Sequence, residues 1–395
     1  MSKSQQLQIG VIAPPWLPVP PTEYGGTELV LDALCRGLRA RGHEVQLFTL
    51  GSSTCNVPTQ WLFDTVDPDR MGASVLELRH VARAYDALEG SGIIHDHTLA
   101  GLFLSQLHPG QAVVATNHGP FDDDLADLYG RAASTVPIIA ISHDQASRAP
   151  AGLPIRQVIH HGLDLARYTP GPGSGDYLVA LGRMSPDKGI ETAIHVARRV
   201  GMDLLIAAKM REPAEERYFK ETIEPLLGNG IDYVGEVGHA DKVTLLQGAH
   251  ALINPIQWPE PFGLVMIEAM ACGTPVVGTP GGAAPEIVDQ GTTGFLGRSV
   301  EELVRGVEEV DSLDRGACRA RVEEHFSMER MARDHEALFR SVLGDCGNGL
   351  QISAAVAKPI GLPPAGRRHE RSRKTLEARP SIALPPAPVV SVTRD

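Results

Sequence analysis

The chain has 395 residues, of which 43% are hydrophobic and 21% are charged, and its formal net charge is −12. This composition is typical of a soluble globular protein, and the length exceeds that of one ordinary domain, so we expect two domains. The acidic balance argues against a nucleic acid as a partner, because phosphate backbones are bound by basic surfaces.

The cysteines and the N-terminus indicate the compartment. Residues 1–8 lack the apolar stretch of a signal peptide, and no run of ~20 apolar residues could span a bilayer. The cysteines are odd in number and form no C-x-x-C pair, which favours a reducing environment without structural zinc. They are Cys35, Cys55, Cys272, Cys318 and Cys346. We therefore expect a cytoplasmic protein, with contact to the inner membrane face as an alternative.

Short β-branched apolar runs alternate with helical patterns along the chain. A turn-rich linker at 171–176 separates two series of predicted strands. The first series is Leu7–Ala13, Glu44–Leu50, Gly92–His95, Ala112–Thr116, Pro137–Ile141 and Ile155–His160, and the second is Tyr177–Gly182, Asp203–Ala208, Ile231–Gly235, Ala251–Asn254, Pro275–Thr279 and Gly294–Leu296. Helices are expected between them, for example at Glu28–Arg41 and Glu191–Val200. This alternation predicts two doubly wound α/β domains, with ligands bound beyond the carboxyl ends of the strands.

Residues 257–275 are the most informative segment. Glu260 lies between two prolines in an extended loop, and a helix is predicted at Leu264–Ala271. The amides of Gly263 and Leu264 at the start of this helix form an anion site, next to Phe262. Glu268 lies two turns beyond Glu260, among apolar residues. Hydrogen-bond acceptors on either side of an anion site suit a nucleotide-sugar, although two glutamates eight residues apart also occur by chance.

Two further loops contain residues that suit a diphosphate. Residues 182–189 follow a predicted strand, and they place Arg183 and Lys188 where a departing nucleoside diphosphate could be stabilised. Gly25 and Gly26 lie between a proline-rich loop and a predicted helix, and they allow backbone amides to approach a phosphate closely. The alternatives are an ordinary loop with surface charges and a plain helix start capped by Thr27.

These motifs together resemble a known family. The 257–275 segment resembles the E-x7-E signature of retaining glycosyltransferases of family 4, which have the GT-B fold of two Rossmann-like parallel-sheet domains facing across a cleft. Residues 182–189 resemble the family's G-R-x4-K-G diphosphate motif, and the resemblance covers about residues 7–345. It implies an acceptor-side domain at 1–170, a donor domain at 171–326 and a closing helix at 327–345, predicted from the helical pattern Ser327–Leu343, that returns to the first domain.

The resemblance also implies roles for single residues. Arg183, Lys188 and the mobile Gly25–Gly26 loop would hold the donor diphosphate. Glu260 would face the transferred sugar, with the Gly263 and Leu264 amides beside it, and Glu268 would hold the ribose hydroxyls. The partners implied are a nucleoside-diphosphate sugar as donor and an unknown hydroxyl acceptor. The reaction implied is transfer with retention by a front-face mechanism, with no cofactor and no essential metal.

Histidines and acidic runs are further candidates. His118 follows a predicted strand and matches a family histidine that contacts the donor sugar, while His97 is a second strand-end candidate. A metal site at His95, Asp96 and His97 is disfavoured because neighbours in a strand point to opposite faces. The acidic run Asp122–Asp124 could bind Mg²⁺, but such runs are usually solvated helix starts.

The sequence also departs from the family pattern. His161 stands where the family usually has asparagine, and Lys209 lies where many relatives have Gly-x-Gly. Lys209 could reach a phosphate or the base, which leaves the nucleotide open. The loop 281–286 is interpreted as mainly structural, with Thr279 and Glu286 near the cleft.

The C-terminal region differs from the rest of the chain. From residue 351 on, eight Lys or Arg stand against three Asp or Glu, a net of +5, which leaves −17 for residues 1–350 (−12 minus +5). Residues 348–395 are predicted to be a disordered, basic and proline-rich tail, with contact to anionic lipid as an alternative.

Other functions remain open at this point. A GT-B nucleotide-sugar epimerase would need no acceptor, and a phosphorylase would need inorganic phosphate and no nucleotide. A non-catalytic nucleotide-sugar-binding module would bind the donor without turnover.

Overall fold

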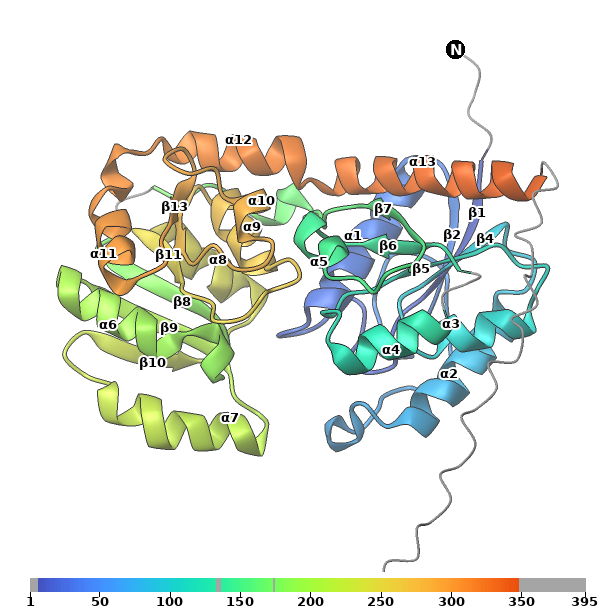
Figure 1. The fold of residues 1–395 in the computed structure, drawn as a ribbon, viewed down its shortest axis with the longest axis horizontal. Coiled ribbons are helices and arrows are strands. Elements are labelled where there is room, and N and C mark those ends of the chain that lie inside the picture. The colour runs from blue at the N-terminus through green and yellow to red at the C-terminus, as the bar shows by residue number, and fades with distance from the viewer. Residues whose placement is uncertain (1–5, 133–135, 173–174, 348–395) are drawn as a thin grey trace, which may run out of the picture. The chain divides into compact units, whose positions relative to one another are not determined.

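Two parallel β-sheets organise the chain in the computed structural model, which describes residues 6–132, 136–172 and 175–347 (Figure 1). The first sheet has seven strands in the order β3-β2-β1-β4-β5-β6-β7, and the second has six in the order β10-β9-β8-β11-β12-β13. The strands are β1 Gln8–Ile12, β2 Glu44–Thr49, β3 Thr59–Trp61, β4 Ile93–Asp96, β5 Val113–Thr116, β6 Ile138–Ala140, β7 Ile155–Val158, β8 Tyr177–Arg183, β9 Asp203–Lys209, β10 Ile231–Gly235, β11 Ala251–Asn254, β12 Val276–Gly278 and β13 Gly294–Leu296. The predicted doubly wound architecture is therefore confirmed.

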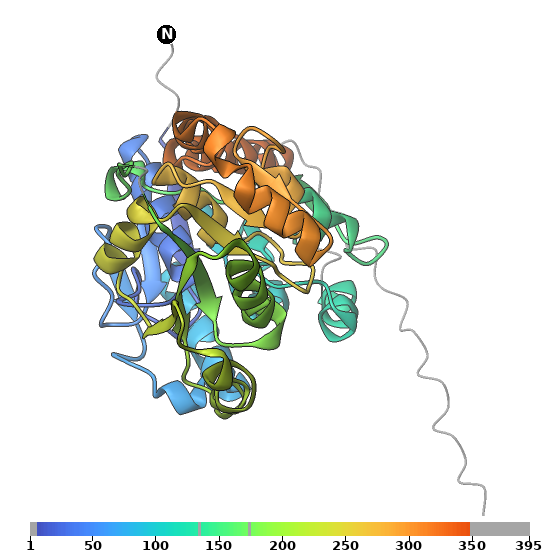
Figure 2. The ribbon, with the colours of Figure 1, turned by 90° about the vertical axis from the view of Figure 1, so that its left-hand side faces the viewer.

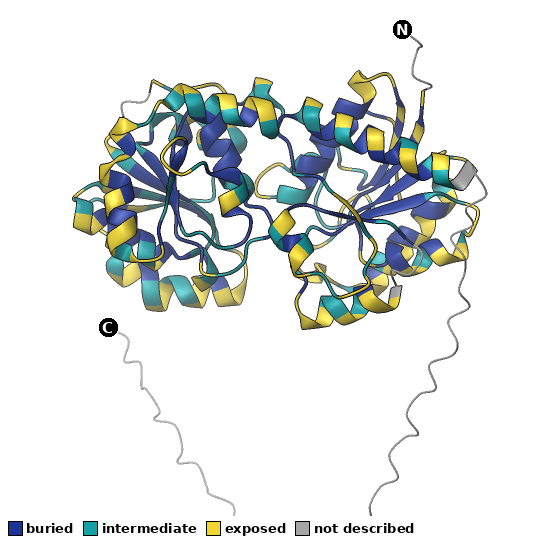
Figure 3. Ribbon diagram, turned by 45° about the horizontal axis from the view of Figure 1, so that its top comes forward, coloured by how far each residue is buried: buried dark blue, intermediate teal, exposed yellow. Residues whose placement is uncertain are grey.

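Helices cover both faces of each sheet, so the inner strands are largely buried, while the edge strands β3, β7 and β10 keep exposed residues (Figure 3). The α-helices are α1 Gly26–Ala40, α2 Ser74–Ala87, α3 Gly101–Leu104, α4 Asp123–Ala132, α5 His143–Ser147, α6 Ile190–Val200, α7 Pro213–Tyr218, α8 His239–Gly248, α9 Leu264–Ala271, α10 Ala284–Ile287, α11 Val300–Glu308, α12 Arg315–His325 and α13 Met328–Gly347. Single 3₁₀ turns are Pro68–Arg70, Ser105–Leu107, Leu165–Arg167, Pro186–Lys188, Glu224–Leu226 and Val310–Ser312, and Phe219–Ile223 is a π-helical turn.

Each sheet has an apolar core on either face. In the first sheet, α1 and α13 pack on one face, and α2, α3 and α4 contribute to the core on the other. In the second sheet, α6 and α11 lie side by side on one face, as Figures 1 and 2 both show, while α8, α9 and α12 lie on the other. Residues in the loops beyond the carboxyl ends of the strands line a cavity.

The predicted strands all form, and one strand was missed. The edge strand β3 has three residues, of which Gln60 and Trp61 are exposed. Three residues are too few to show a period-two pattern, and an edge position does not require apolar side chains. The predicted helix at Leu264–Ala271 forms with those bounds as α9.

The last helix returns to the first sheet. Helix α12 packs against α9 of the second sheet, and the chain then crosses at a bridge between Leu163 and Ser327. Helix α13 packs against α1, where a side chain on Gly37 would collide with Ala332. The predicted tail at 348–395 and its basic cluster lie outside the described residues. Within the described ranges, no helix is both long enough and apolar enough to cross a bilayer.

Candidate functional site

Helix α9 is preceded by a glycine in the left-handed region, and the start of the helix lines a cavity. Gly263 has φ 92°, which an L side chain adopts only with strain, and it follows the buried Phe262. The amide of Leu264 therefore lies at the helix start, where it has no partner within the helix. Glu268, one turn further along, is only 2% exposed.

The loop that carries Glu260 is fixed by a second close backbone approach. The Ala283 amide donates to the Glu260 carbonyl at 3.0 Å, and Gly282 has φ 59°. A side chain on Gly282 would collide with the Glu260 backbone. The interpretation of the 281–286 loop as structural therefore agrees with these contacts: it holds Glu260 in place.

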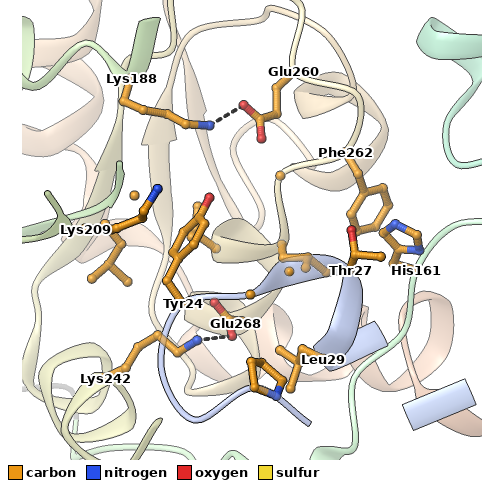
Figure 4. A pocket seen from close by; sticks show the side chains of 18 of the residues that line it. Tyr24, Thr27, Leu29, His161, Lys188, Lys209, Lys242, Glu260, Phe262 and Glu268 are labelled. Carbon is orange, nitrogen blue, oxygen red and sulfur yellow. Dashed lines mark hydrogen bonds and ion pairs between the residues drawn. The ribbon is translucent and has the colours of Figure 1, made fainter. Parts of the chain in front are cut away.

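A cavity of about 240 Å³ lies beyond the carboxyl edges of both sheets (Figure 4). Its lining includes every residue predicted to bind or act on the donor except Arg183. The lining residues are Pro21, Glu23, Tyr24, Gly25, Gly26, Thr27, Leu29, His118, Ile141, His161, Arg167, Leu181, Gly182, Lys188, Ala207, Lys209, Glu236, Val237, His239, Lys242, Asn254, Trp258, Glu260, Pro261, Phe262, Gly263, Leu264, Val265 and Glu268.

Lys188 and Glu260 form an ion pair at one end of this cavity. The Lys188 Nζ lies 2.5 Å from Glu260 Oε2, and the two side chains are 10% and 17% exposed. The ammonium also lies 5.5 Å from the centre of the Trp258 ring, within the range of a cation–π contact. Gly189, at φ 68°, turns the chain from the Lys188 loop into α6, and a side chain there would collide with the Pro255 carbonyl.

Glu268 lies in a second charged cluster at the opposite end of the cavity (Figure 4). Its Oε1 accepts hydrogen bonds from the Tyr168 hydroxyl at 2.7 Å and from the Lys242 ammonium at 2.5 Å. Burial first, and then the Glu268 charge, raise the pKa of Tyr168, so the phenol stays protonated and donates. Sequence reasoning missed both partners, because no motif links Glu268 to residues 26 and 100 positions away.

Arg183 and Lys209 end two adjacent strands, in register with each other. The Lys209 ammonium lines the cavity and pairs with Glu212 at 3.0 Å and Glu215 at 3.6 Å. The Arg183 guanidinium pairs with Asp187 at 3.3 Å and is not among the lining residues.

The lining residues on the first sheet's side of the cavity form a wall that differs from the charged clusters described above. Gly26 lies against the start of α9, since a Cβ there would be 3.1 Å from Leu264 Cδ1. The neighbouring Tyr24 amide donates to Glu236 of the second sheet's side at 3.2 Å. The Gly25–Gly26 loop therefore contacts both the α9 start and a loop after β10.

Five histidines form a continuous column that ends in this wall. Ring centroids are 5.2 Å apart for His335 and His95, 3.9 Å for His95 and His97, 5.1 Å for His97 and His118, and 5.2 Å for His118 and His161. His97 Nδ1 and His118 Nε2 share a hydrogen bond of 2.8 Å. Burial lowers the pKa of His118 and of His335 to about 4, so both are neutral at pH 7.

Only the cavity end of this column could be expected from the sequence. The positions of His118 and His161 in the sequence indicate a role at the site, and both line the cavity. His95 and His97 were recognised only as strand-end residues, and His335 is contributed by α13, far along the chain. The column depends on α13 returning to the first sheet.

The remaining metal-site candidates have other partners. Asp122 Oδ1 accepts from the Leu125 amide and so caps α4, which agrees with a helix start. Asp96 accepts from Thr98 and from the Tyr85 hydroxyl, on the opposite side from the His95 and His97 rings, as expected for strand neighbours. These contacts leave no shared coordination point for the three residues.

Thr279 and Glu286 have structural contacts. The Thr279 hydroxyl donates to the Ile256 carbonyl. Glu286 accepts from the backbone amides of His143 and Asp144 at 2.8 Å each and from His160 Nε2 at 2.7 Å. The His143, His160 and Glu286 ligand atoms lie within 4.8 Å of one another, and this group is separate from the cavity lining.

The fold and the cavity define the chain as a glycosyltransferase of the GT-B class. Residues 24–167 match the model described as Glycosyltransferase Family 4, and residues 169–324 match Glycosyl transferases group 1. The chain belongs to glycosyltransferase family 4, as the motifs predicted.

Curated relatives agree with this assignment. The chain is 28% identical to the D-inositol 3-phosphate glycosyltransferase of Mycolicibacterium smegmatis, over 81% of this chain and 86% of that one. It is 33% identical to the N-acetyl-alpha-D-glucosaminyl L-malate synthase of Bacillus anthracis, over 30% of this chain and 33% of that one. It thus spans only about a third of the synthase.

Solved structures share the fold. A glycosyltransferase involved in avilamycin A biosynthesis is similar with a TM-score of 0.64 and 26% identity, over 86% of this chain and 98% of that one. The sucrose-phosphate synthase of Thermosynechococcus elongatus has a TM-score of 0.69 at 22% identity, over 86% of this chain and all of that one.

Proposed function

We propose that this enzyme transfers a sugar from a nucleoside-diphosphate sugar to a hydroxyl acceptor with retention of configuration. The observation that supports this most is the order of groups in one cavity: the Lys188–Glu260 pair, the start of α9, and then Glu268 (Figure 4). A cation beside a carboxylate, a helix start and a second carboxylate match a sugar, a diphosphate and a ribose in sequence.

The diphosphate is the ligand that Lys188 is placed to bind. Glu260 pairs with this ammonium, and a phosphate would compete for it. Glu260 would then be released toward the transferred sugar. The Gly25, Gly26 and Leu264 amides add uncharged donors, and Lys209 adds a second cation. Arg183 would have to exchange Asp187 for the phosphate.

Glu268 is proposed to bind the ribose diol, because a carboxylate can accept two hydrogen bonds. Lys242 and Tyr168 hold its Oε1, which fixes the carboxylate before the donor arrives. Such preorganisation lowers the entropy lost on binding.

In the transfer step, the acceptor oxygen bonds to the anomeric carbon while the bond from that carbon to the phosphate oxygen breaks. The acceptor proton moves to the departing phosphate oxygen on the same face, so no protein base is needed. His118, kept neutral by burial, would orient the sugar by hydrogen bonding. Water would be excluded by closure of the cavity, so that the alcohol reacts.

The positive charge for this step is proposed to come from Lys188, Lys209, Arg183 and backbone amides, with no essential metal. If so, EDTA should leave the rate of nucleoside diphosphate release unchanged. A loss of activity that Mg²⁺ or Mn²⁺ restores would contradict this part of the proposal.

The test begins with donor binding. UDP-, GDP- and ADP-sugars are titrated in thermal-shift experiments against the wild type and Glu268→Ala, and a specific donor should raise the melting temperature of the wild type alone. UDP-glucose is the first probe, because a GT-B neighbour from Anabaena is described in complex with it.

The second stage is the product. Proton NMR of the product should show the anomeric configuration of the donor, and nucleoside diphosphate release should depend on an acceptor. An inverted product would overturn the retaining mechanism. An epimer formed from donor alone, or turnover that needs inorganic phosphate and no nucleotide, would replace transfer by epimerase or phosphorylase activity.

A further inference from the structure

We propose that the acceptor is an uncharged sugar or polyol rather than a phosphorylated or carboxylated one. This inference rests on the proposed function and concerns the half of the cavity that the first sheet supplies. It distinguishes this chain from relatives whose names include a phosphate or malate.

The first observation is the wall itself. Of the lining residues that precede the 3₁₀ turn Leu165–Arg167, the polar ones are neutral, and only Glu23 is charged. Glu23 is already paired with Arg211, which also binds Glu236 at 2.8 Å. The others are Pro21, Tyr24, Gly25, Gly26, Thr27, Leu29, His118, Ile141 and His161.

The second observation concerns the rim around this wall. The loops that follow β1 to β7, all within the described residues, span 13–25, 50–58, 62–73, 97–100, 117–122, 141–142 and 159–164. They contain one Lys or Arg, Arg70, which follows the edge strand β3. They contain six acids: Glu23, Asp64, Asp67, Asp69, Asp122 and Asp164.

The histidines do not supply the missing cation. Burial lowers the pKa of His118 to about 4 and moves that of His161 well below its ordinary value. Each ring is also next to another imidazole, so a proton on one would be repelled by a proton on the next. At neutral pH this wall offers hydrogen bonds without charge.

The cations of the cavity are placed on the other side. Lys188, Lys209 and Lys242 belong to the second sheet's side, and each already has a carboxylate partner. The fourth lining cation, Arg167, comes directly before Tyr168, and its backbone carbonyl lies 3.2 Å from His239 Nε2, so it belongs to the Glu268 end of the cavity. A donor diphosphate would take up the exchangeable charge there. An anionic acceptor beside it would then face a diphosphate and an acidic rim with no cation of its own.

A neutral polyol fits the same wall. The Thr27 and Tyr24 hydroxyls and the His118 ring both donate and accept, which matches sugar hydroxyls. Leu29 and Ile141 offer apolar surface to the C–H face of a ring. Charge is therefore the property by which this wall selects its substrate.

The test uses acceptors in pairs that differ only in charge. With a donor whose binding has been shown by thermal shift, nucleoside diphosphate release is measured with glucose, mannose, fructose and myo-inositol and with their monophosphates, and with glucose against glucuronate. We expect at least one neutral member to react with a kcat/KM at least about 30-fold above that of its charged partner, the cost of an unpaired charge.

Three outcomes would overturn the inference. These are a phosphorylated or carboxylated member that reacts better than its neutral partner, equal rates within the reacting pairs, and no reaction with any pair while the donor binds. If no nucleotide-sugar binds, the proposed function itself fails, and the two failures are thereby distinguished.

A matched pair of variants localises the effect. Pro120 follows β5 at its carboxyl end and Pro109 precedes it at the other end. Pro120→Lys adds a cation to the rim and should raise kcat/KM for the phosphorylated partner at least about fivefold, while Pro109→Lys should not. The rate with the neutral member shows that both variants are folded. An equal response of the two variants would place the acceptor away from this rim and overturn the argument.

Discussion

The carboxyl edges of the two sheets have the same architecture and opposite chemistry. Each sheet reverses its strand order once, between β1 and β4 and between β8 and β11, and the cavity lies beyond both reversals. The second edge presents Arg183, Lys188 and Lys209, whereas the first presents neutral histidines. The same fold therefore fixes where side chains are placed, and loop residues decide what they bind.

The two edges also differ in how they avoid unfavourable charge. The second edge pairs its ions, as in Lys188–Glu260 and Lys242–Glu268. The first edge keeps buried imidazoles neutral by desolvation. Under the proposed function, a donor diphosphate would compete with Glu260 for Lys188, whereas the neutral imidazoles have no ion pair to break.

The largest effect is expected from removing a cation of the second edge. Lys188→Ala should lower kcat by about 10³, because a group aimed at developing charge is lost from a low-dielectric site. Lys220→Ala, at an exposed position of the same half of the chain, is the control and should retain full activity. The measurement is the rate of nucleoside diphosphate release. Equal losses in affinity and turnover would mean that Lys188 only binds the donor.

The second prediction tests the other ion pair. Glu268→Gln should raise the Kd of the donor by about 30- to 100-fold. The variant loses a charge-assisted hydrogen bond to the donor, and it leaves the Lys242 ammonium without its carboxylate. Calorimetric titration measures the Kd. Lys242→Met should give a smaller loss, and the double variant should lose less than the sum of the two, because the residues act as one pair. Additive losses would show that Lys242 does not position Glu268.

The third prediction concerns the first edge and its buried imidazoles. His335 has a folded pKa of about 4 against an ordinary value near 6.5, so the unfolded chain binds more protons between these values. Stability from this residue is therefore complete above pH 6.5 and is lost as the pH falls toward 4, by about 2 kcal/mol at pH 5.

Urea unfolding at pH 8 and pH 5 measures that loss. His335→Leu should reduce the difference between the two pH values by about 2 kcal/mol, whatever it does to stability at pH 8. The control is His195→Leu, whose side chain is half exposed and should leave the difference unchanged. An unchanged difference in His335→Leu would show that the ring is protonated in the folded protein at pH 5.

The smallest expected effect is that of salt on KM, which should differ between the ligands of the two edges. Raising NaCl from 0.1 to 0.5 M should increase the KM for the donor about threefold, because salt screens the attraction between cations and diphosphate. The KM for a neutral acceptor should not change. A parallel rise in both would mean that charge also governs the first edge.

The sequence alone was sufficient where a function depends on residues near one another in the chain. The apolar period of Leu264–Ala271, with glycine before it, predicted α9 with its observed bounds. Local dihedral preference and helix termination decide such a segment, and they brought Glu260 and Glu268 to one helix start. Strand-end positions likewise predicted that Lys188, Lys209 and His118 would line a shared cavity.

Tertiary structure decided the rest. Lys242 and Tyr168 reach Glu268 only after α8 and the 3₁₀ turn before Tyr168 pack around α9, and the histidine column forms only when α13 returns to the first sheet. These contacts join residues up to 240 positions apart, between His95 and His335. Local periodicity contains no signal for such pairings, because they arise from the burial of apolar faces that can pack in many ways. The charged and neutral residues of the two edges can be read from the sequence. Only the fold shows that their loops lie on opposite sides of one cavity.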